Sequence, residues 1–119
     1  MKTIQEEIQN LSSEIQLSKT ILTALGDSMR LYMILAMMEY DDCNGMRVVE
    51  IAEKVRLSRT AASHHIKILK NAGILKMRRE GTKNYYYFDA DMESLDCLIN
   101  MLIHAKKIML ELPDRSGDD

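Results

Sequence analysis

Residues 58–73 read Ser-Arg-Thr-Ala-Ala-Ser-His-His-Ile-Lys-Ile-Leu-Lys-Asn-Ala-Gly, and this pattern predicts a helix with two different faces. Ala62, Ile66 and Leu69 recur at spacings of four and three residues, which places them on one apolar side. Ser58 is suited to cap the first turn, because its side-chain oxygen can accept a hydrogen bond from an unpaired backbone N–H. The segment is therefore an amphipathic helix whose other side carries hydroxyl, imidazole and cationic groups.

A shorter helix precedes this one along the chain. Apolar residues at helical spacing predict a helix over residues 47–55, and a tight turn at Arg56 leads into the next helix. Gly73 readily adopts the left-handed backbone that closes a helix, so the second helix is expected to end near Asn71. Residues 47–71 thus predict a helix-turn-helix, in which the second helix enters the major groove of DNA.

A hairpin with a basic tip is predicted directly after this motif. Residues 74–78 and 85–88 are rich in residues that favour strands, and the polar segment 79–84 separates them. A hairpin at 74–88 in this position is a wing, which lies on the DNA backbone beside the groove. The predicted fold class is mainly α with a two-stranded β-wing, a single winged helix-turn-helix domain.

The candidate DNA contacts combine hydroxyl, imidazole, amide and cationic side chains from the second helix and the wing. They are Ser58, Arg59, Thr60, Ser63, His64, Lys67, Arg78, Arg79, Lys83 and Asn84. Such groups can bind base edges or phosphates. His65 points about 100° away from its neighbour on a helix, so we expect it to pack or to form a hydrogen bond inside the protein.

Charge is strongly segregated along the chain. Residues 54–83 contain nine basic residues and one acidic residue, a local charge of +8. Because the net charge of the chain is −2, the remaining residues carry a charge of −10. One positive face for phosphates follows from this distribution. The alternative is a winged-helix module that binds a protein partner without reading DNA. No nucleophile–base pair, phosphate loop or carboxylate pair indicates an enzyme.

The flanking segments predict long amphipathic helices at residues 1–25 and 91–112, with a frayed tail at 113–119. Another helix, from about Ser28 to Tyr40, carries Leu31, Ile34, Leu35 and Met38. The apolar stripes of the terminal helices are longer than a compact core of this size should absorb, so we expect them to form a homodimer interface. In the alternative interpretation both helices fold back on their own monomer.

These stretches resemble the ArsR/SmtB family of winged helix-turn-helix repressors. The resemblance covers roughly residues 20 to 105, and its most specific part is the Ser-His-His run at 63–65 followed by Leu-Lys-x-Ala-Gly. It implies a homodimer bound to double-stranded DNA at a palindromic operator. Arg56 departs from the family pattern, which usually has Gly there; a left-handed Arg costs about 1 kcal/mol.

The resemblance also implies two possible places for a metal. The first, a Cys-x-Cys pair, reads Arg47-Val48-Val49 here and holds no thiol. The second corresponds to Asp91, Glu93, His104 and Lys107, where the ammonium of Lys107 would repel a divalent cation. No cofactor is therefore expected. Zinc or another divalent metal at Asp91, Glu93 and His104 is the alternative to a helix cap at Asp91 and an interface role for His104.

The two cysteines, Cys43 and Cys97, are the candidates for a thiol switch. Neither falls in a metal-binding pattern, and the acidic residues beside them would raise a thiol pKa. The ten methionines are expected to pack in apolar faces. No segment has the length of a membrane span or the core of a signal peptide, so we expect a cytoplasmic protein.

Overall fold

The computed structural model describes residues 2–40, 44–88 and 92–117. It contains five helices and one antiparallel hairpin within these residues: α1 (Ile4–Leu25), α2 (Ser28–Met38), α3 (Val48–Val55), α4 (Arg59–Asn71), β1 (Leu75–Glu80), β2 (Lys83–Phe88) and α5 (Glu93–Glu111). The molecule is elongated, with extents of 57 × 36 × 24 Å. The predicted winged helix-turn-helix fold is confirmed.

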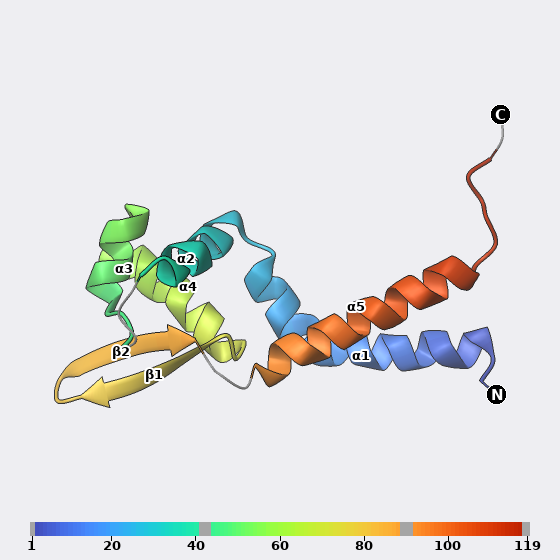
Figure 1. Cartoon of the computed structure of the whole chain (residues 1–119), viewed down its shortest axis with the longest axis horizontal. Coiled ribbons are helices and arrows are strands. Elements are labelled where there is room, and N and C mark those ends of the chain that lie inside the picture. The colour runs from blue at the N-terminus through green and yellow to red at the C-terminus, as the bar shows by residue number, and fades with distance from the viewer. Residues whose placement is uncertain (1, 41–43, 89–91, 118–119) are drawn as a thin grey trace.

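Figure 1 shows two parts of different character. The α2, α3 and α4 helices and the hairpin form a compact head. The α1 and α5 helices lie side by side, antiparallel to each other, and both extend to the same side of the head. The bounds of the terminal helices are slightly shorter than the predicted 1–25 and 91–112. Met92 occupies the N-cap position of α5 with a left-handed φ of 48°, and the predicted cap, Asp91, lies outside the described residues.

The core of the head follows the predicted apolar faces of the helix-turn-helix. Ala62, Ile66 and Leu69 are the buried residues of α4. Ile51, Ala52 and Val55 are those of α3, and the two helices pack against each other. Because the buried sides face inward, the polar side of α4 is left exposed, as the sequence predicts.

The α2 helix differs from its prediction. It ends at Met38 rather than near Tyr40, and its buried residues are Arg30, Met33, Ala36 and Met37. Leu31, Leu35 and Met38, which the sequence indicates as its apolar positions, are exposed. The helix is apolar almost all round, so spacing alone does not tell which side meets the core.

The hairpin is tighter than predicted. The strands pair from Leu75 with Phe88 to Glu80 with Lys83, so the turn holds only Gly81 and Thr82 rather than residues 79–84. Gly81 has a φ of 63°, which suits the first position of a two-residue hairpin turn of the II′ kind. The backbone of the tip therefore projects as a two-stranded ribbon.

Among the described residues no single helix is long and apolar enough to cross a membrane; only α1 and α2 taken together pass that test, and they are bent by 76° at their junction.

The turn between α3 and α4 carries a measurable strain. Arg56 has φ 57° and ψ 43°, the left-handed conformation that its place in the motif predicts. This costs a residue with a Cβ about 1–2 kcal/mol, whereas Gly would lose about 0.5–1 kcal/mol through its greater freedom in the unfolded chain. We expect Arg56→Gly to raise the free energy of unfolding by about 0.5–1 kcal/mol in urea denaturation. Arg56→Ala keeps the Cβ and should give no such gain; an equal gain from both would assign the effect to the lost charge.

Candidate nucleic-acid interface

The first turn of α4 is fixed by its cap. Ser58 Oγ accepts a hydrogen bond from the backbone N–H of Ala61 at 3.1 Å, as predicted. Upstream, the N–H of Leu57 donates to the carbonyl of Ala52 at 3.0 Å, which closes α3. The N-terminal end of α4 therefore stands at a defined angle to α3, with unpaired backbone N–H groups available to an anion such as a DNA phosphate.

The predicted contact residues of α4 lie together on its outer side. They are all exposed: Arg59, Thr60, Ser63, His64 and Lys67. His65 instead turns inward, and its Nδ1 lies 3.1 Å from a guanidinium nitrogen of Arg30. The two adjacent histidines thus have different surroundings, as predicted, and only His64 is presented on the surface of the recognition helix.

Arg30 connects three helices beneath this surface. Its guanidinium donates to the carbonyls of Ala24 at 2.7 Å and Thr23 at 3.0 Å, near the end of α1. It also lies 3.4 Å from the carboxylate of Asp27, which caps α2 by accepting from the N–H of Met29. Arg30 was not predicted as a functional residue; its signal in the sequence is that it is the lone cation on a helix otherwise rich in apolar residues.

The wing brings further cations to the same side. Lys83, at the start of β2, lines a shallow pocket of about 80 Å³ together with Arg59 of α4 and Arg47, which precedes α3. Asn84 lines it as well. Three positive side chains from three separate segments therefore surround one depression at the junction of helix-turn-helix and wing. Arg47 was missed by the sequence reasoning, which treated it only as a helix start.

The other two predicted wing residues differ in their surroundings. Arg78 donates to the carbonyl of Asn44 at 2.6 Å and to Glu80 at 3.0 Å, and its guanidinium lies 5.0 Å from the centre of the Tyr85 ring. It therefore attaches the wing to the segment before α3. Arg79 is exposed, and its Nε donates to the carbonyl of Gly81 at 3.1 Å.

The candidate metal residues of α5 do not fit a divalent cation within one chain. Glu93 and His104 are eleven residues apart on one helix, which separates them by about 16 Å. His104 Nδ1 lies 2.8 Å from the carboxylate of Glu14 on α1, and Lys107 contributes an ammonium group. Within the described ranges no group of three or more His, Cys, Asp or Glu side chains could hold a metal.

Only one of the two candidate thiols lies within the described residues. Cys97 is exposed on α5 as a free cysteine, and Cys43 lies outside the described residues. Met33 and Met101 lie in the core, as their apolar positions predict, whereas Met38 and Met109 are exposed.

Comparisons with known proteins agree with this geometry. Residues 27–76 match the family described as "Bacterial regulatory protein, arsR family". An HTH-type transcriptional regulator of Methanocaldococcus jannaschii is 42% identical over 72 residues, which cover 60% of this chain and 76% of that one. A transcriptional repressor SmtB homologue of Synechocystis is 31% identical over 107 residues, covering 90% of this chain and 76% of its own.

Solved structures show the same fold. NolR of Sinorhizobium fredii has a TM-score of 0.58 at 24% identity, over 76% of this chain and 85% of that one. A homodimeric winged helix-turn-helix DNA-binding domain of Mycobacterium bovis has a TM-score of 0.57 at 21% identity, over 91% and 92%. Together with the two relatives, these likenesses confirm the resemblance inferred from the sequence. The chain belongs to the arsR family of bacterial regulatory proteins, whose members are winged helix-turn-helix transcriptional regulators and not enzymes.

Proposed function

We propose that this protein represses transcription by binding a palindromic operator as a homodimer, with α4 of each subunit in a major groove. The observation that carries this proposal is the exposed polar side of α4 lying beside the cationic pocket of Arg47, Arg59 and Lys83. The α4 side chains supply hydrogen-bonding groups for base edges, while the pocket supplies charge for the backbone. Because a repressor acts where the chromosome lies, the proposal places the protein in the cytoplasm.

Each predicted contact then has a place in the complex. Ser58 remains the cap of α4 and offers its hydroxyl group to a phosphate, while Arg59, Thr60, Ser63, His64 and Lys67 face the groove. Arg79, Lys83 and Asn84 lie at the tip of the wing, suited to the adjacent backbone. Arg78 supports the wing indirectly, through its hydrogen bond to the carbonyl of Asn44. The rival role, a module that binds only a protein partner, gives no reason for this clustering of cations.

The test is a fluorescence-anisotropy titration against DNA from the protein's own promoter region across a salt series, with scrambled DNA alongside. We expect tight binding of one dimer per site, preference over scrambled DNA, and affinity that falls steeply with salt because phosphate contacts release counterions. Equal affinity for every promoter-region fragment and for the scrambled DNA would contradict the proposal.

The dimer interface is assigned to the outer faces of α1 and α5. The two helices pack on each other through residues such as Met101 and Ile108, which are buried. Yet the opposite side of α5 exposes Ile99, Leu102 and Ile103. Folding back on the monomer and dimerisation are therefore not exclusive: one side of α5 covers α1, and the other leaves a stripe that a second subunit can bury.

We expect Leu102→Glu to weaken the dimer at least 100-fold in sedimentation equilibrium. Leu102 is 52% exposed in the single chain, and burying a leucine side chain contributes about 1.5–3 kcal/mol. In the variant, each dimer would bury two carboxylates in place of two such leucines. Lys107→Glu, an exposed position to the side of the stripe, is the matched control and should leave the dimer intact. An unchanged dimer in Leu102→Glu would place the interface elsewhere.

A cadmium resistance regulatory protein homologue of Staphylococcus aureus is 45% identical over 42 residues, which cover 35% of each chain. Its name refers to a metal, so metal binding is the alternative to consider for this chain. The α5 residues of this chain do not fit that role, since Lys107 stands at one ligand position and His104 is paired with Glu14. We expect less than one equivalent of zinc per dimer in equilibrium dialysis. Binding of one or more equivalents, lost in His104→Ala, would contradict this expectation.

A further inference from the structure

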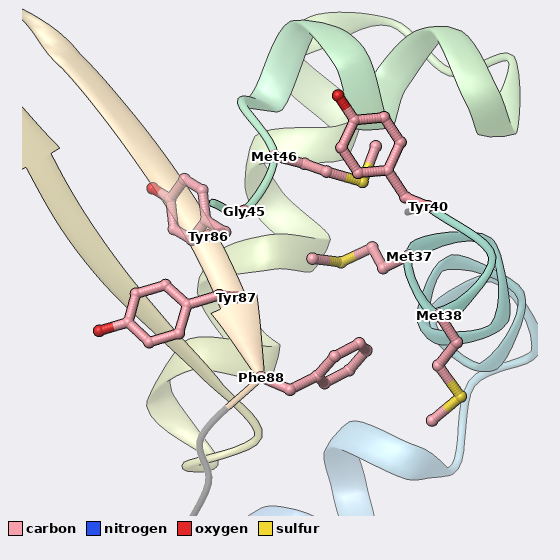
Figure 2. A pocket seen from close by; sticks show the side chains of 8 residues that line it. All are labelled: Met37, Met38, Tyr40, Gly45, Met46, Tyr86, Tyr87 and Phe88. Atoms are coloured by element: carbon pink, nitrogen blue, oxygen red, sulfur yellow. The ribbon is translucent and has the colours of Figure 1, made fainter. Parts of the chain in front are cut away.

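A cavity of about 390 Å³ lies between the end of α2, the segment before α3 and strand β2. Figure 2 shows Met37 and Met38 on α2 facing Phe88 of the wing, with Met46, Tyr40 and Tyr86 closing the other side. None of the described residues that line this cavity carries a charge. It is distinct from the cationic pocket of the DNA-binding surface, with which it shares no lining residue.

A second, smaller cavity adjoins the first. It measures about 110 Å³ and is lined by apolar side chains, among them Leu25 of α1, Ile34 of α2 and Leu95 of α5. Met38 and Phe88 line both cavities, so these two side chains form the partition between them. Movement of Phe88 or of the exposed Met38 side chain would join the two spaces.

The lining defines the chemistry of an occupant. Thioether sulfurs and aromatic rings favour flat, polarisable apolar molecules, and methionine adapts its shape to fill irregular gaps. A charged molecule would lose its hydration without gaining an oppositely charged partner among the described lining residues. Since an apolar cavity of about 150 Å³ accommodates benzene, this larger one has room for two fused rings. We infer that this cavity binds a neutral aromatic small molecule that acts as the effector of the regulator.

The cavity is linked to the DNA-binding elements by its own walls. Met46 and Tyr86 exchange two backbone hydrogen bonds, of 2.9 and 2.8 Å, which attach β2 to the residue just before the helix-turn-helix. Gly45 allows this approach, because a Cβ there would lie 2.7 Å from the carbonyl oxygen of Tyr86. A molecule that separates Tyr86 from Met46 therefore changes the position of the wing relative to α3.

This coupling rests on the proposed function, and it must be reciprocal between the occupant and DNA. If an occupant favours an arrangement in which wing and α4 no longer fit DNA together, it weakens operator binding, and DNA weakens the occupant by the same factor. The second cavity lies beside Leu95 near the start of α5, so an occupant that displaces Met38 or Phe88 would also contact the helix pair assigned to the dimer.

The first experiment needs no DNA. Protein labelled with ¹³C at the methionine methyl groups is titrated with 1-naphthol, a neutral two-ring aromatic, and followed by NMR. We expect saturable shifts of the Met37, Met38 and Met46 methyl signals, while Met101, buried between α1 and α5, stays unchanged. Shifts that do not saturate, or that are largest at Met101, would overturn the site.

Two variants sharpen this result. Met38→Trp places a large ring at the partition and should lower the affinity for 1-naphthol at least tenfold. Leu35→Trp is the matched control, because it is also an exposed position of α2 but lines neither cavity. Equal affinities of the two variants would contradict the assignment of the cavity.

The coupling is tested separately by operator titrations with and without saturating 1-naphthol. We expect at least a tenfold loss of operator affinity in the wild type and in Leu35→Trp, and a clearly smaller loss in Met38→Trp at the same concentration. Unchanged operator affinity with the site saturated would overturn the effector role. If the protein instead fails to bind operator DNA, the proposed function fails, and the methyl titration still decides whether the cavity is a site.

Discussion

Replacing Arg30 by methionine is expected to lower the free energy of unfolding by about 3 kcal/mol. Arg30 is only 8% exposed, and its guanidinium donates to two carbonyls of the last turn of α1 and lies 3.1 Å from Nδ1 of His65 on α4. Helix C-terminal carbonyls lack partners inside the helix, so removing the cation leaves the buried carbonyl of Ala24 unsatisfied, while that of Thr23 still accepts the N–H of Gly26 at 3.3 Å. Methionine preserves the length of the apolar stem, which limits the loss to the polar contacts.

The ion pair with Asp27 contributes less to this estimate than the carbonyl contacts do. Its closest approach is 3.4 Å and the carboxylate side chain is 28% exposed, so solvent weakens the attraction. The measurement is urea denaturation at one fixed protein concentration, because dissociation of a dimer would otherwise enter the result. Arg59→Met makes the same chemical change at the exposed start of α4 and should stay within about 0.5 kcal/mol of wild type. A loss below about 1 kcal/mol in Arg30→Met would show that the contacts are dispensable.

The position of Arg30 also explains how the head is oriented on the long helices. Its guanidinium reaches from α2 to the end of α1 on one side and to His65 on the other. The recognition helix is therefore held through a charged connection as well as through apolar packing. His65 is the inner neighbour of His64, so the same contact sets the rotation of α4 that exposes His64.

The parts of this fold that could be predicted are those set by local signals. The Ser58 cap and the buried side of α4 each depend on a few neighbouring residues, and each is found where the sequence indicates. The β-prone runs likewise placed the wing. These features depend on backbone geometry and on the periodicity of apolar residues, and both can be inferred from a single short segment of the sequence. The left-handed Arg56 follows instead from the family pattern, which usually has Gly at that place.

The parts that could not be predicted depend on contacts between segments. Leu31 and Leu35 are exposed while Arg30 is buried, because the neighbours of α2, and not its own pattern, select the buried side. Arg79 and Asn84 pair within the hairpin although neither favours a strand, since pairing continues to the two-residue turn. Arg47 joins the cationic pocket only because the wing folds back beside α3.

We expect the double substitution Arg59→Met with Lys67→Met to lower operator affinity by about 10² to 10³-fold at moderate salt. Both cations are exposed on the outer side of α4, and a contact from such a side chain to a base or phosphate is worth about 1–3 kcal/mol. Loss of two cations should also reduce the slope of log affinity against log salt by about two. The measurement is the anisotropy titration on operator DNA across the salt series, with unfolding curves to show that both variants are folded.

The matched control separates position from net charge. Lys19→Met with Lys107→Met removes two exposed cations from α1 and α5, giving the same total charge far from the pocket of Arg47, Arg59 and Lys83. If α4 reads the groove, this control keeps operator affinity within a few-fold of wild type, because screening makes distant charges weak at moderate salt. Equal losses in both pairs would mean that only the overall charge attracts DNA, and no loss in the α4 pair would remove this helix from the interface. A chain of net charge −2 has no general attraction for DNA. Binding must therefore depend on where the cations lie, and nine basic residues lie within 54–83, the segment that contains α4.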